Sequence, residues 1–356
     1  MTTTTSERRS PARDSAPMLS VRDLTVTFQR HGEEAFRAVD GVSFDVRPGQ
    51  TVGLVGESGC GKSVTSLAIM RLLPKRGNRV TGTVDFEGTD LLSLSDAKMR
   101  DRRGRDIAMV FQDPLSSLNP VVPVGVQVAE VLERHRGMSR KAAMPVAADL
   151  LKRVGIPDPD RRIKDYPHQM SGGMRQRALI AIAVACAPRL LIADEPTTAL
   201  DVTIQAQILA LLKELVVETG TALIMITHDL GVVAGLCDEV NVLYGGRIVE
   251  RGDRHPLFRD PRHPYTNGLL ASIPRLDAAG QRLTPIPGSV ADNLPWDHAC
   301  AFAPRCSQPI DVCTEITPEL EVSGGRALRC HNPVSAHGPV SHQHPTTDYE
   351  EGVEGR

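Results

Sequence analysis

One short segment limits the possible folds of this chain more than any other. Residues 56–63 read Gly-Glu-Ser-Gly-Cys-Gly-Lys-Ser and match the pattern G-x-x-x-x-G-K-[ST]. The apolar run Thr51–Val55 precedes them, and a helical pattern begins at Lys62. Glycines let the backbone wrap closely around phosphate oxygens, and the N–H groups of the loop and of the helix N-terminus then face the negative charge. The segment therefore predicts a strand, a phosphate-binding loop (the phosphate loop, residues 56–63) and a helix.

Two side chains of the phosphate loop have a predicted role beside the backbone. Lys62 is placed to reach the β- and γ-phosphates of a nucleotide, and the Ser63 hydroxyl is placed to ligate Mg²⁺. The nucleotide-binding residues expected here are Gly56, Glu57, Ser58, Gly59, Cys60, Gly61, Lys62, Ser63 and Val64.

A pair of carboxylates follows a second apolar run. Leu190–Ala193 predicts a buried parallel strand, and Asp194 and Glu195 come directly after it. Ligands of open α/β sheets bind beyond the C-terminal ends of the strands. We therefore expect Asp194 to contact Mg²⁺, directly or through water, and Glu195 to polarise an attacking water. The alternative is a solvated pair that caps the next helix.

The pattern around these motifs predicts an α/β domain with a largely parallel sheet, because short β-branched runs alternate with helical stretches from Leu19 to about Glu250. The strands before Gly56 resemble an antiparallel meander. Strands are expected at Val21–Phe28, Gly41–Val46, Gln50–Val55, Thr83–Phe86, Ile107–Val110, Leu190–Ala193, Ala222–Ile226 and Glu239–Tyr244. Helices are expected at Lys62–Leu72, Gly125–His135, Ser139–Val154, Met174–Ala185 and Thr203–Glu218.

Composition excludes several classes of protein. Lys and Arg number 41 against 43 Asp and Glu, so a strongly basic nucleic-acid binder is not expected, and the 3% of aromatic residues offers little for base stacking. The best membrane-span candidate, residues 178–193, is broken by Pro188 and Arg189. Residues 1–17 have no apolar core and are expected to be a disordered leader rather than a secretory signal. Without a signal, the seven cysteines indicate a reducing compartment.

A third motif lies between the phosphate loop and the carboxylate pair, and it resembles that of a known protein family. Residues 170–177 read Met-Ser-Gly-Gly-Met-Arg-Gln-Arg and resemble the signature loop of ABC-transporter nucleotide-binding subunits, with Met170 where Leu is usual. The resemblance implies a P-loop NTPase of the ABC type: a mixed sheet core, an antiparallel β subdomain and a helical subdomain. It implies an ATPase in which this loop acts in trans, on ATP held by a partner subunit. The residues implied in that contact are Ser171, Gly172, Gly173 and Gln176.

Further positions of the family fall in the expected order. The resemblance implies that Gln112 contacts Mg²⁺ and water, and that His228 contacts the γ-phosphate and orients the nucleophile. It places Asp201 in the D-loop and Phe28 against adenine, with Phe36 as the alternative. The implied nucleotide-binding domain covers residues 18–252, with its helical subdomain at about 113–172.

Four further segments resemble the oligopeptide/dipeptide importer branch of the family. They are Phe111–Pro120, Tyr166–His168, Thr198–Thr203 and Arg262–Thr266. This resemblance implies ATP hydrolysis that powers import of di- or oligopeptides, with nickel or metal chelates as the alternative solute. The alternative from a different functional class is a soluble ABC ATPase that acts on DNA or ribosomes. Such proteins usually carry tandem nucleotide domains or long coiled-coil insertions, and this sequence shows neither.

The importer resemblance also implies partners and a location. The partners are a second ABC ATPase subunit, identical or distinct, two integral-membrane permeases and an extracytoplasmic solute-binding protein, with no nucleic acid. The location is peripheral, on the cytoplasmic face of the cell membrane. Two C-terminal regions complete the chain: a Pro-rich segment at 253–333 (the C-terminal extension), in which only short elements are expected, and a mobile tail at 334–356.

The C-terminal extension holds four of the seven cysteines. Cys300, Cys306, Cys313 and Cys330 are spaced C-x5-C-x6-C-x16-C. Four thiols in one short region suit a four-thiolate metal site, although the spacing is not that of a zinc ribbon. The resemblance implies a [4Fe–4S] cluster, since some relatives hold one in this extension. Zinc and free thiols in a small core are the alternatives.

Overall fold

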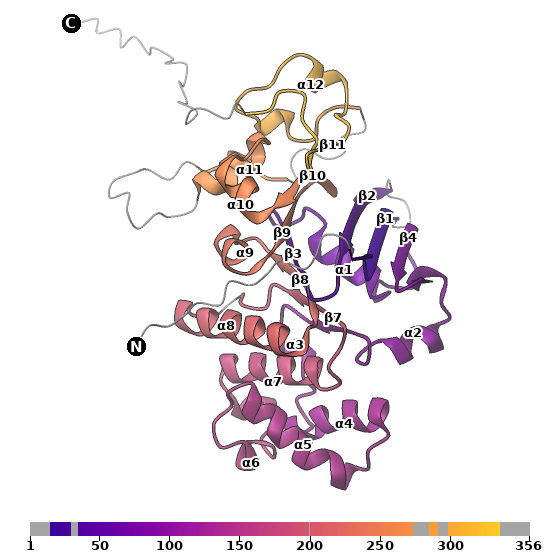
Figure 1. Ribbon diagram of the computed structural model, residues 1–356, viewed down its shortest axis with the longest axis vertical. Coiled ribbons are helices and arrows are strands. Elements are labelled where there is room, and N and C mark those ends of the chain that lie inside the picture. Colours follow the sequence, from indigo (N-terminus) through magenta and orange to yellow (C-terminus); the bar gives the residue numbers. More distant parts are fainter. Residues whose placement is uncertain (1–14, 30–34, 199, 273–284, 291–297, 335–356) are drawn as a thin grey trace, which may run out of the picture.

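A computed structural model describes five ranges of the chain: residues 15–29, 35–198, 200–272, 285–290 and 298–334 (Figure 1). Most of the expected leader, residues 1–14, and of the expected tail, residues 335–356, lies outside these ranges. Within them, no helix is both long and apolar enough to cross a membrane.

The centre of the molecule is a sheet of eight strands. Their order across the sheet is β11 (Glu321–Ser323), β12 (Arg326–Leu328), β10 (Arg247–Asp253), β9 (Glu239–Tyr244), β3 (Thr51–Val55), β8 (Ala222–Thr227), β7 (Leu190–Asp194) and β6 (Ile107–Val110). From β9 to β6 all neighbours are parallel, whereas β10, β11 and β12 run antiparallel to their neighbours. Successive residues of the inner strands belong alternately to two apolar clusters, one on each face, so both faces of the sheet are covered.

A second sheet of four antiparallel strands packs beside the first. It consists of β2 (Phe36–Val46), β1 (Leu19–Phe28), β4 (Asn78–Phe86) and β5 (Thr89–Asp90). The predicted antiparallel arrangement is confirmed for β1 and β2. It is wrong for β3, which pairs in parallel with β8 and β9 in the central sheet. All five residues of β3 are buried, as a strand covered on both faces requires.

The helices fall into groups along the chain. Those between β3 and β9 along the chain are α1 (Lys62–Ile69), α2 (Asp96–Arg102), α3 (Pro114–Ser117), α4 (Val124–Arg136), α5 (Arg140–Arg153), α6 (Pro159–Arg162), α7 (Gly172–Val184), α8 (Val202–Thr219) and α9 (Leu230–Leu236). Helices α4, α5, α6 and α7 gather at one end of the molecule (Figure 1). Helix α1 is shorter than predicted, because Arg71 takes a left-handed backbone with φ of 51°.

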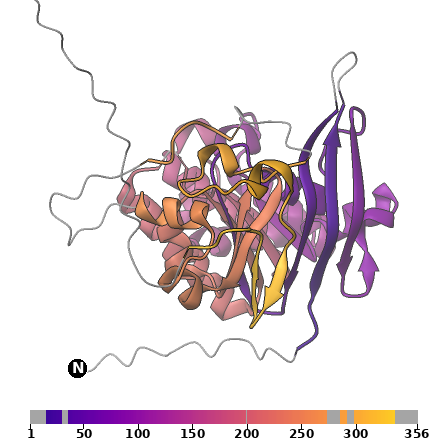
Figure 2. The same ribbon diagram turned by 90° about the horizontal axis from the view of Figure 1, so that it is seen from above.

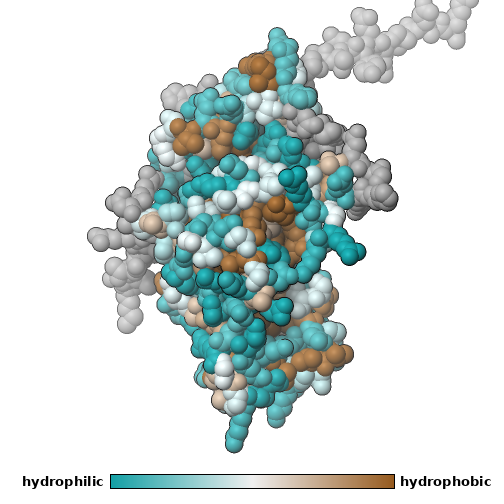
Figure 3. Space-filling view, turned by 90° about the vertical axis from the view of Figure 1, so that its right-hand side faces the viewer, coloured by the Kyte–Doolittle hydropathy of each residue, from teal (hydrophilic) through white to brown (hydrophobic). Residues whose placement is uncertain are grey.

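The predicted fold class, an ABC-type α/β core with an antiparallel β subdomain and a helical subdomain, is confirmed. The C-terminal extension contributes the short helices α10 (Arg254–Arg259), α11 (Pro264–Ala271) and α12 (Val312–Glu315). Its strand β12 pairs with β10, with Glu250 opposite Leu328, so the extension continues the central sheet (Figure 2). On the face shown in Figure 3 hydrophilic residues predominate, and hydrophobic residues gather near its centre.

Candidate nucleotide-binding site

The phosphate loop connects β3 to α1, and its shape depends on two glycines. Gly56 has φ of 151°, and a Cβ there would lie 2.3 Å from the Leu243 carbonyl oxygen. Gly61 has φ of 93°, and a Cβ there would lie 2.4 Å from the Ala38 carbonyl oxygen. Both positions therefore admit only glycine, for backbone conformation and for space.

Lys62 begins α1 and is buried, with 4% of its surface exposed. Its Nζ donates to the carbonyl of Gly56 at 2.7 Å and to that of Glu57 at 2.9 Å. Two loop carbonyls thus fix the ammonium group at the loop whose N–H groups are expected to bind phosphate.

Ser63 and Asp194 bring the two sequence motifs into contact. The Ser63 hydroxyl donates to Asp194 Oδ1 at 2.9 Å, and Asp194 is the last residue of β7. Burial raises the pKa of Asp194, and the hydrogen bond from Ser63 opposes that rise. A hydroxyl and a carboxylate side by side fit Mg²⁺, which takes oxygen ligands and is commonly held by one or two protein groups beside phosphates.

Glu195 is held in a defined orientation at the end of β7. Its backbone is left-handed, with φ of 44°, and its N–H donates to the Ile226 carbonyl at 2.9 Å. Gln112 Nε2 donates to Glu195 Oε2 at 3.0 Å, and His228 Nδ1 lies 3.3 Å from Oε1. The structure thus brings Gln112, Glu195 and His228 together.

A third side chain on this carboxylate, Thr198, was not predicted from the sequence as a site residue. The Thr198 hydroxyl donates to Glu195 Oε2 at 2.8 Å. Thr198 follows Glu195 by three residues in a tight turn, in which its N–H also donates to the Glu195 carbonyl at 3.2 Å. A hydroxyl residue three positions after the carboxylate was the available signal.

Several of these groups line a cleft of about 890 Å³, whereas Asp194 and Thr198 are not among its lining residues. Its walls include Phe28 and Phe36, which lie opposite each other on β1 and β2. The floor includes most of the phosphate loop with Val64, and Gln112, Glu195 and His228 lie along it. One wall comes from the C-terminal extension, for which the sequence predicted no part in this site: Leu269, Gly288, Ser289 and Val290.

The loop of residues 171–173 lies apart from the walls of this cleft. Ser171 is exposed and caps α7, accepting a hydrogen bond from the Met174 N–H at 3.3 Å. Gln176, one turn further along α7, is buried with 1% of its surface exposed. Asp201 is exposed and caps α8, where it accepts from the Ile204 N–H at 2.9 Å.

The four cysteines of the C-terminal extension lie within electrostatic reach of one another. Burial, with a smaller contribution from the other three thiols, raises the pKa of Cys330 to about 12. The Cys300 N–H donates to the Cys313 carbonyl at 2.8 Å. Over the described residues, no three His, Cys, Asp or Glu side chains converge closely enough to hold one metal ion. The four thiols of the predicted metal site are therefore near one another, but the described residues show no metal-binding geometry.

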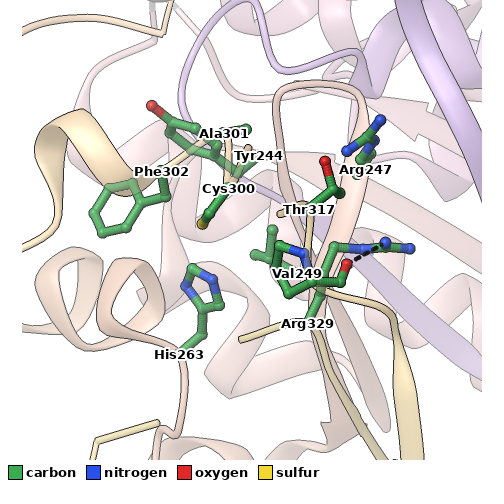
Figure 4. A pocket seen from close by; sticks show the side chains of 10 residues that line it. Tyr244, Arg247, Val249, His263, Cys300, Ala301, Phe302, Thr317 and Arg329 are labelled. Carbon is green, nitrogen blue, oxygen red and sulfur yellow. Dashed lines mark hydrogen bonds between the residues drawn. The ribbon is translucent and has the colours of Figure 1, made fainter. Parts of the chain in front are cut away.

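Cys300 also borders a small cavity of about 10 Å³ between the extension and the central sheet (Figure 4). His263, Phe302 and Arg329 are among its lining residues. Space of this size holds one water molecule at most, so the cavity is a packing feature rather than a ligand site.

Two family profiles and several known transport proteins match this chain. A profile of the family described as "ABC transporter" matches residues 39–198, and one described as "Oligopeptide/dipeptide transporter, C-terminal region" matches residues 249–313. The chain is 54% identical over 315 residues to the dipeptide transport ATP-binding protein DppD of Bacillus subtilis (strain 168), covering 88% of this chain and 94% of that one. It is 48% identical over 317 residues to the oligopeptide transport ATP-binding protein OppD of Salmonella typhimurium, covering 89% and 94%.

Two solved structures of ABC proteins resemble this chain in fold. The ATP-binding cassette MJ0796, solved as a dimer in a post-hydrolysis state bound to ADP and Pi, matches with a TM-score of 0.60 and 30% identity, over 67% of this chain and 99% of that one. The protein cbiO1 from Clostridium perfringens, part of the ABC transporter complex cbiONQ, matches with a TM-score of 0.57 and 26% identity, over 68% and 91%.

Proposed function

This chain belongs to the ABC transporter family as an ATP-hydrolysing subunit, and from that premise we propose that it powers the import of di- or oligopeptides. The observation that carries the proposal is the arrangement of Gln112, Glu195 and His228 at the cleft of the phosphate loop, in a chain whose C-terminal extension matches the peptide-transporter profile.

Glu195 is the proposed base. Its carboxylate takes hydrogen bonds from Gln112 and Thr198 on one oxygen and faces His228 with the other. A carboxylate fixed in this way can orient a water for in-line attack on the γ-phosphate and take its proton. Phosphoryl transfer asks mainly for positioning and charge stabilisation, which Lys62, Gln112 and His228 supply around the phosphate.

Ser63 and Asp194 are the proposed holders of Mg²⁺, with Gln112 as a third oxygen donor. When bound, Mg²⁺ neutralises charge that develops on the phosphate oxygens. The Ser63 hydroxyl and the Asp194 carboxylate lie side by side, so the two proposed ligands are already neighbours.

Two nucleotide domains are proposed to close on ATP, each using the loop of residues 171–173 on the ATP of its partner. Ser171 is exposed at the N-terminus of α7, where backbone N–H groups and the helix dipole favour an anion. The loop lies outside the cleft of its own chain, as a contact in trans requires. The dimeric state of the MJ0796 cassette with ADP and Pi supports this arrangement. The proposed partner is an identical or a distinct ATPase subunit.

The membrane partners are proposed to dock near the segment after Gln112. Leu115 is 64% exposed and Val121 is 78% exposed, both between Gln112 and α4. Exposed apolar side chains at such a position suit burial against permease subunits. The chain would then lie peripherally at the cytoplasmic face of the membrane, and an extracytoplasmic binding protein would deliver the solute.

The proposal is tested by solute uptake. In a strain that depends on this chain, the native protein should support uptake of a radiolabelled dipeptide, and Glu195→Gln should abolish it while the protein still binds ATP. Uptake of nickel in place of peptide would overturn the peptide assignment but not the ATPase. ATP hydrolysis undiminished by Glu195→Gln would overturn the role of Glu195.

We further propose that the four cysteines hold a [4Fe–4S] cluster. A four-iron cluster spreads its thiolates over four iron atoms, so the thiols need not converge on one point. Their proximity in a region of short elements supports a covalent staple there. Anaerobic purification with iron analysis and absorbance near 400 nm tests it; zinc at one equivalent, or metal-free protein, would overturn it.

A further inference from the structure

The second residue of the phosphate loop, Glu57, is held by the C-terminal extension in two places. Its backbone N–H donates to the hydroxyl of Tyr265 at 2.8 Å. Its carboxylate accepts two parallel hydrogen bonds from Arg305, at 2.6 Å from Nη1 and 2.9 Å from Nη2. These contacts span 208 and 248 residues of sequence and join the extension directly to the nucleotide site.

Arg305 is built into this position with every donor used. Its side chain is 2% exposed. Beyond Glu57, Nε donates to the Pro287 carbonyl at 2.7 Å, Nη2 to the Gly288 carbonyl at 3.1 Å, and Nη1 to the Tyr244 hydroxyl at 3.4 Å. A guanidinium has five N–H donors, and five acceptors are present. Arg305 therefore ties the phosphate loop to Pro287 and Gly288, and residues 288–290 line the cleft.

Tyr265 is also fixed in position, by burial, ring packing and a hydrogen bond. It is fully buried, and its ring packs edge-on against Tyr244, with 4.7 Å between centroids, and at a tilt against Phe302, with 5.3 Å between centroids. Its N–H donates to Nδ1 of buried His263 at 3.1 Å, and the His263 N–H donates to Glu250 at 3.0 Å. The segment around residues 263–265, singled out by the sequence but without a function there, thus presents one hydroxyl to the phosphate loop.

The chemistry of Glu57 explains why such contacts matter. A carboxylate in a phosphate-binding loop repels the triphosphate it must accommodate, and the repulsion is larger in a partly buried site. A bidentate arginine neutralises that charge and fixes its direction. The Tyr265 hydroxyl fixes the backbone of the same residue, whose carbonyl accepts from Lys62.

We propose that Arg305 and Tyr265 are positioning residues for ATP binding: they preform the phosphate loop and cancel the charge of Glu57. Neither acts on the reacting atoms, so they affect the affinity for ATP and not the chemical step. The inference rests on the ATP-binding part of the proposed function and adds the C-terminal extension to the nucleotide site.

The test is the split between KM and kcat in ATP hydrolysis by the full chain. Tyr265→Phe should raise KM for ATP about fivefold, and Arg305→Met at least tenfold, with kcat at saturating ATP within twofold of the native protein. The double variant Glu57→Gln with Arg305→Met removes both charges and should recover most of the lost affinity. Arg305→Lys keeps the charge without the parallel hydrogen bonds and should fall between.

A matched control separates positioning from stability. Arg326 also joins the extension to carboxylates, Glu250 at 2.8 Å and Asp260 at 3.3 Å. Arg326→Lys should lower Tm without changing KM. KM unchanged in the folded Tyr265→Phe and Arg305→Lys variants would overturn the inference, as would a double variant no better than Arg305→Met. A native chain that binds no ATP would overturn the proposed function instead.

Discussion

The hydroxyl of Ser63 donates to a carboxylate oxygen of Asp194 at 2.9 Å, across 131 residues of sequence. Ser63 is the second residue of α1 and Asp194 is the last residue of β7, so the contact fixes the phosphate loop against the end of the sheet where the attacking water is expected. The rest of the site is arranged around this pair.

Ser63→Ala should lower Mg²⁺-dependent ATP hydrolysis at least a hundredfold, because it removes one proposed ligand and leaves Asp194 without its hydrogen bond. The measurement is kcat over a range of Mg²⁺ concentrations. Burial raises the pKa of Asp194, so the carboxylate gains a proton at a higher pH than usual. The Mg²⁺ concentration required should therefore rise as the pH falls toward the acidic range.

Ser66→Ala is the matched control for this experiment. Its hydroxyl lies one turn along α1 and donates to the Ser63 carbonyl at 2.8 Å, with no role at Asp194. We expect a modest loss of stability, about 1 kcal/mol, and an unchanged Mg²⁺ requirement. Equal losses of activity in both variants would show that the hydroxyl of Ser63 acts through folding alone.

Thr198 offers a more selective test of the catalytic carboxylate. Thr198→Val removes the hydroxyl that donates to Glu195 at 2.8 Å, while Gln112 still donates to the same oxygen. Loss of one orienting hydrogen bond should lower kcat about tenfold and leave KM for ATP unchanged. Thr198→Ser keeps the hydroxyl and should restore most of the rate. A Ser variant as slow as Val would show that the methyl group, and not the hydrogen bond, matters.

The sequence predicted the inner sheet well and its border poorly, for physical reasons. Strands β6 and β9 occur at the predicted bounds. The four residues of β6 are all apolar, as suits a strand covered on both faces, whereas β9 is apolar at four of its six positions and buries the polar Asn241. Helix α9 was not predicted, since its two glycines and two valines give a weak helical signal.

The C-terminal extension was predicted only as a region of short elements. Its strand β12 forms against β10, and Arg326 pairs there with buried Glu250, so tertiary contacts set its structure. The same limit applies to the site. Motif spacing predicted Gln112, Glu195 and His228, whereas no periodicity relates Glu57 to Arg305, 248 residues later.

Two glycines with the same backbone conformation should respond differently to alanine. Gly61 and Gly137 both have left-handed φ, +93° and +64°, but a Cβ at Gly61 meets the Ala38 carbonyl at 2.4 Å whereas one at Gly137 meets nothing within 4 Å. Gly137→Ala should cost about 1 kcal/mol of stability and leave ATP binding intact. Gly61→Ala should abolish ATP binding, measured by nucleotide titration. Native ATP affinity in Gly61→Ala would show that the loop tolerates a shift.

Buried His263 predicts how the stability of the protein depends on pH. Burial lowers its pKa to about 3, from 6.5 when exposed, and its Nδ1 accepts the Tyr265 N–H. Above pH 6.5 the ring is neutral in both the folded and the unfolded chain, so its titration does not affect the free energy of unfolding. As the pH falls toward 3, the ring gains a proton in the unfolded chain but stays neutral in the folded chain, so the free energy of unfolding decreases. The loss between pH 8 and pH 5 is about 2 kcal/mol.

Urea unfolding at pH 8 and pH 5 measures this loss. His263→Asn keeps an acceptor at the start of α11 and removes the titrating ring, so its free energy of unfolding should fall about 2 kcal/mol less between the two pH values than that of the native protein. His255→Asn, at an exposed position, controls for the removal of a histidine and should leave the native pH dependence in place. If His263→Asn loses as much stability as the native chain on acidification, other groups cause the loss and His263 does not control it.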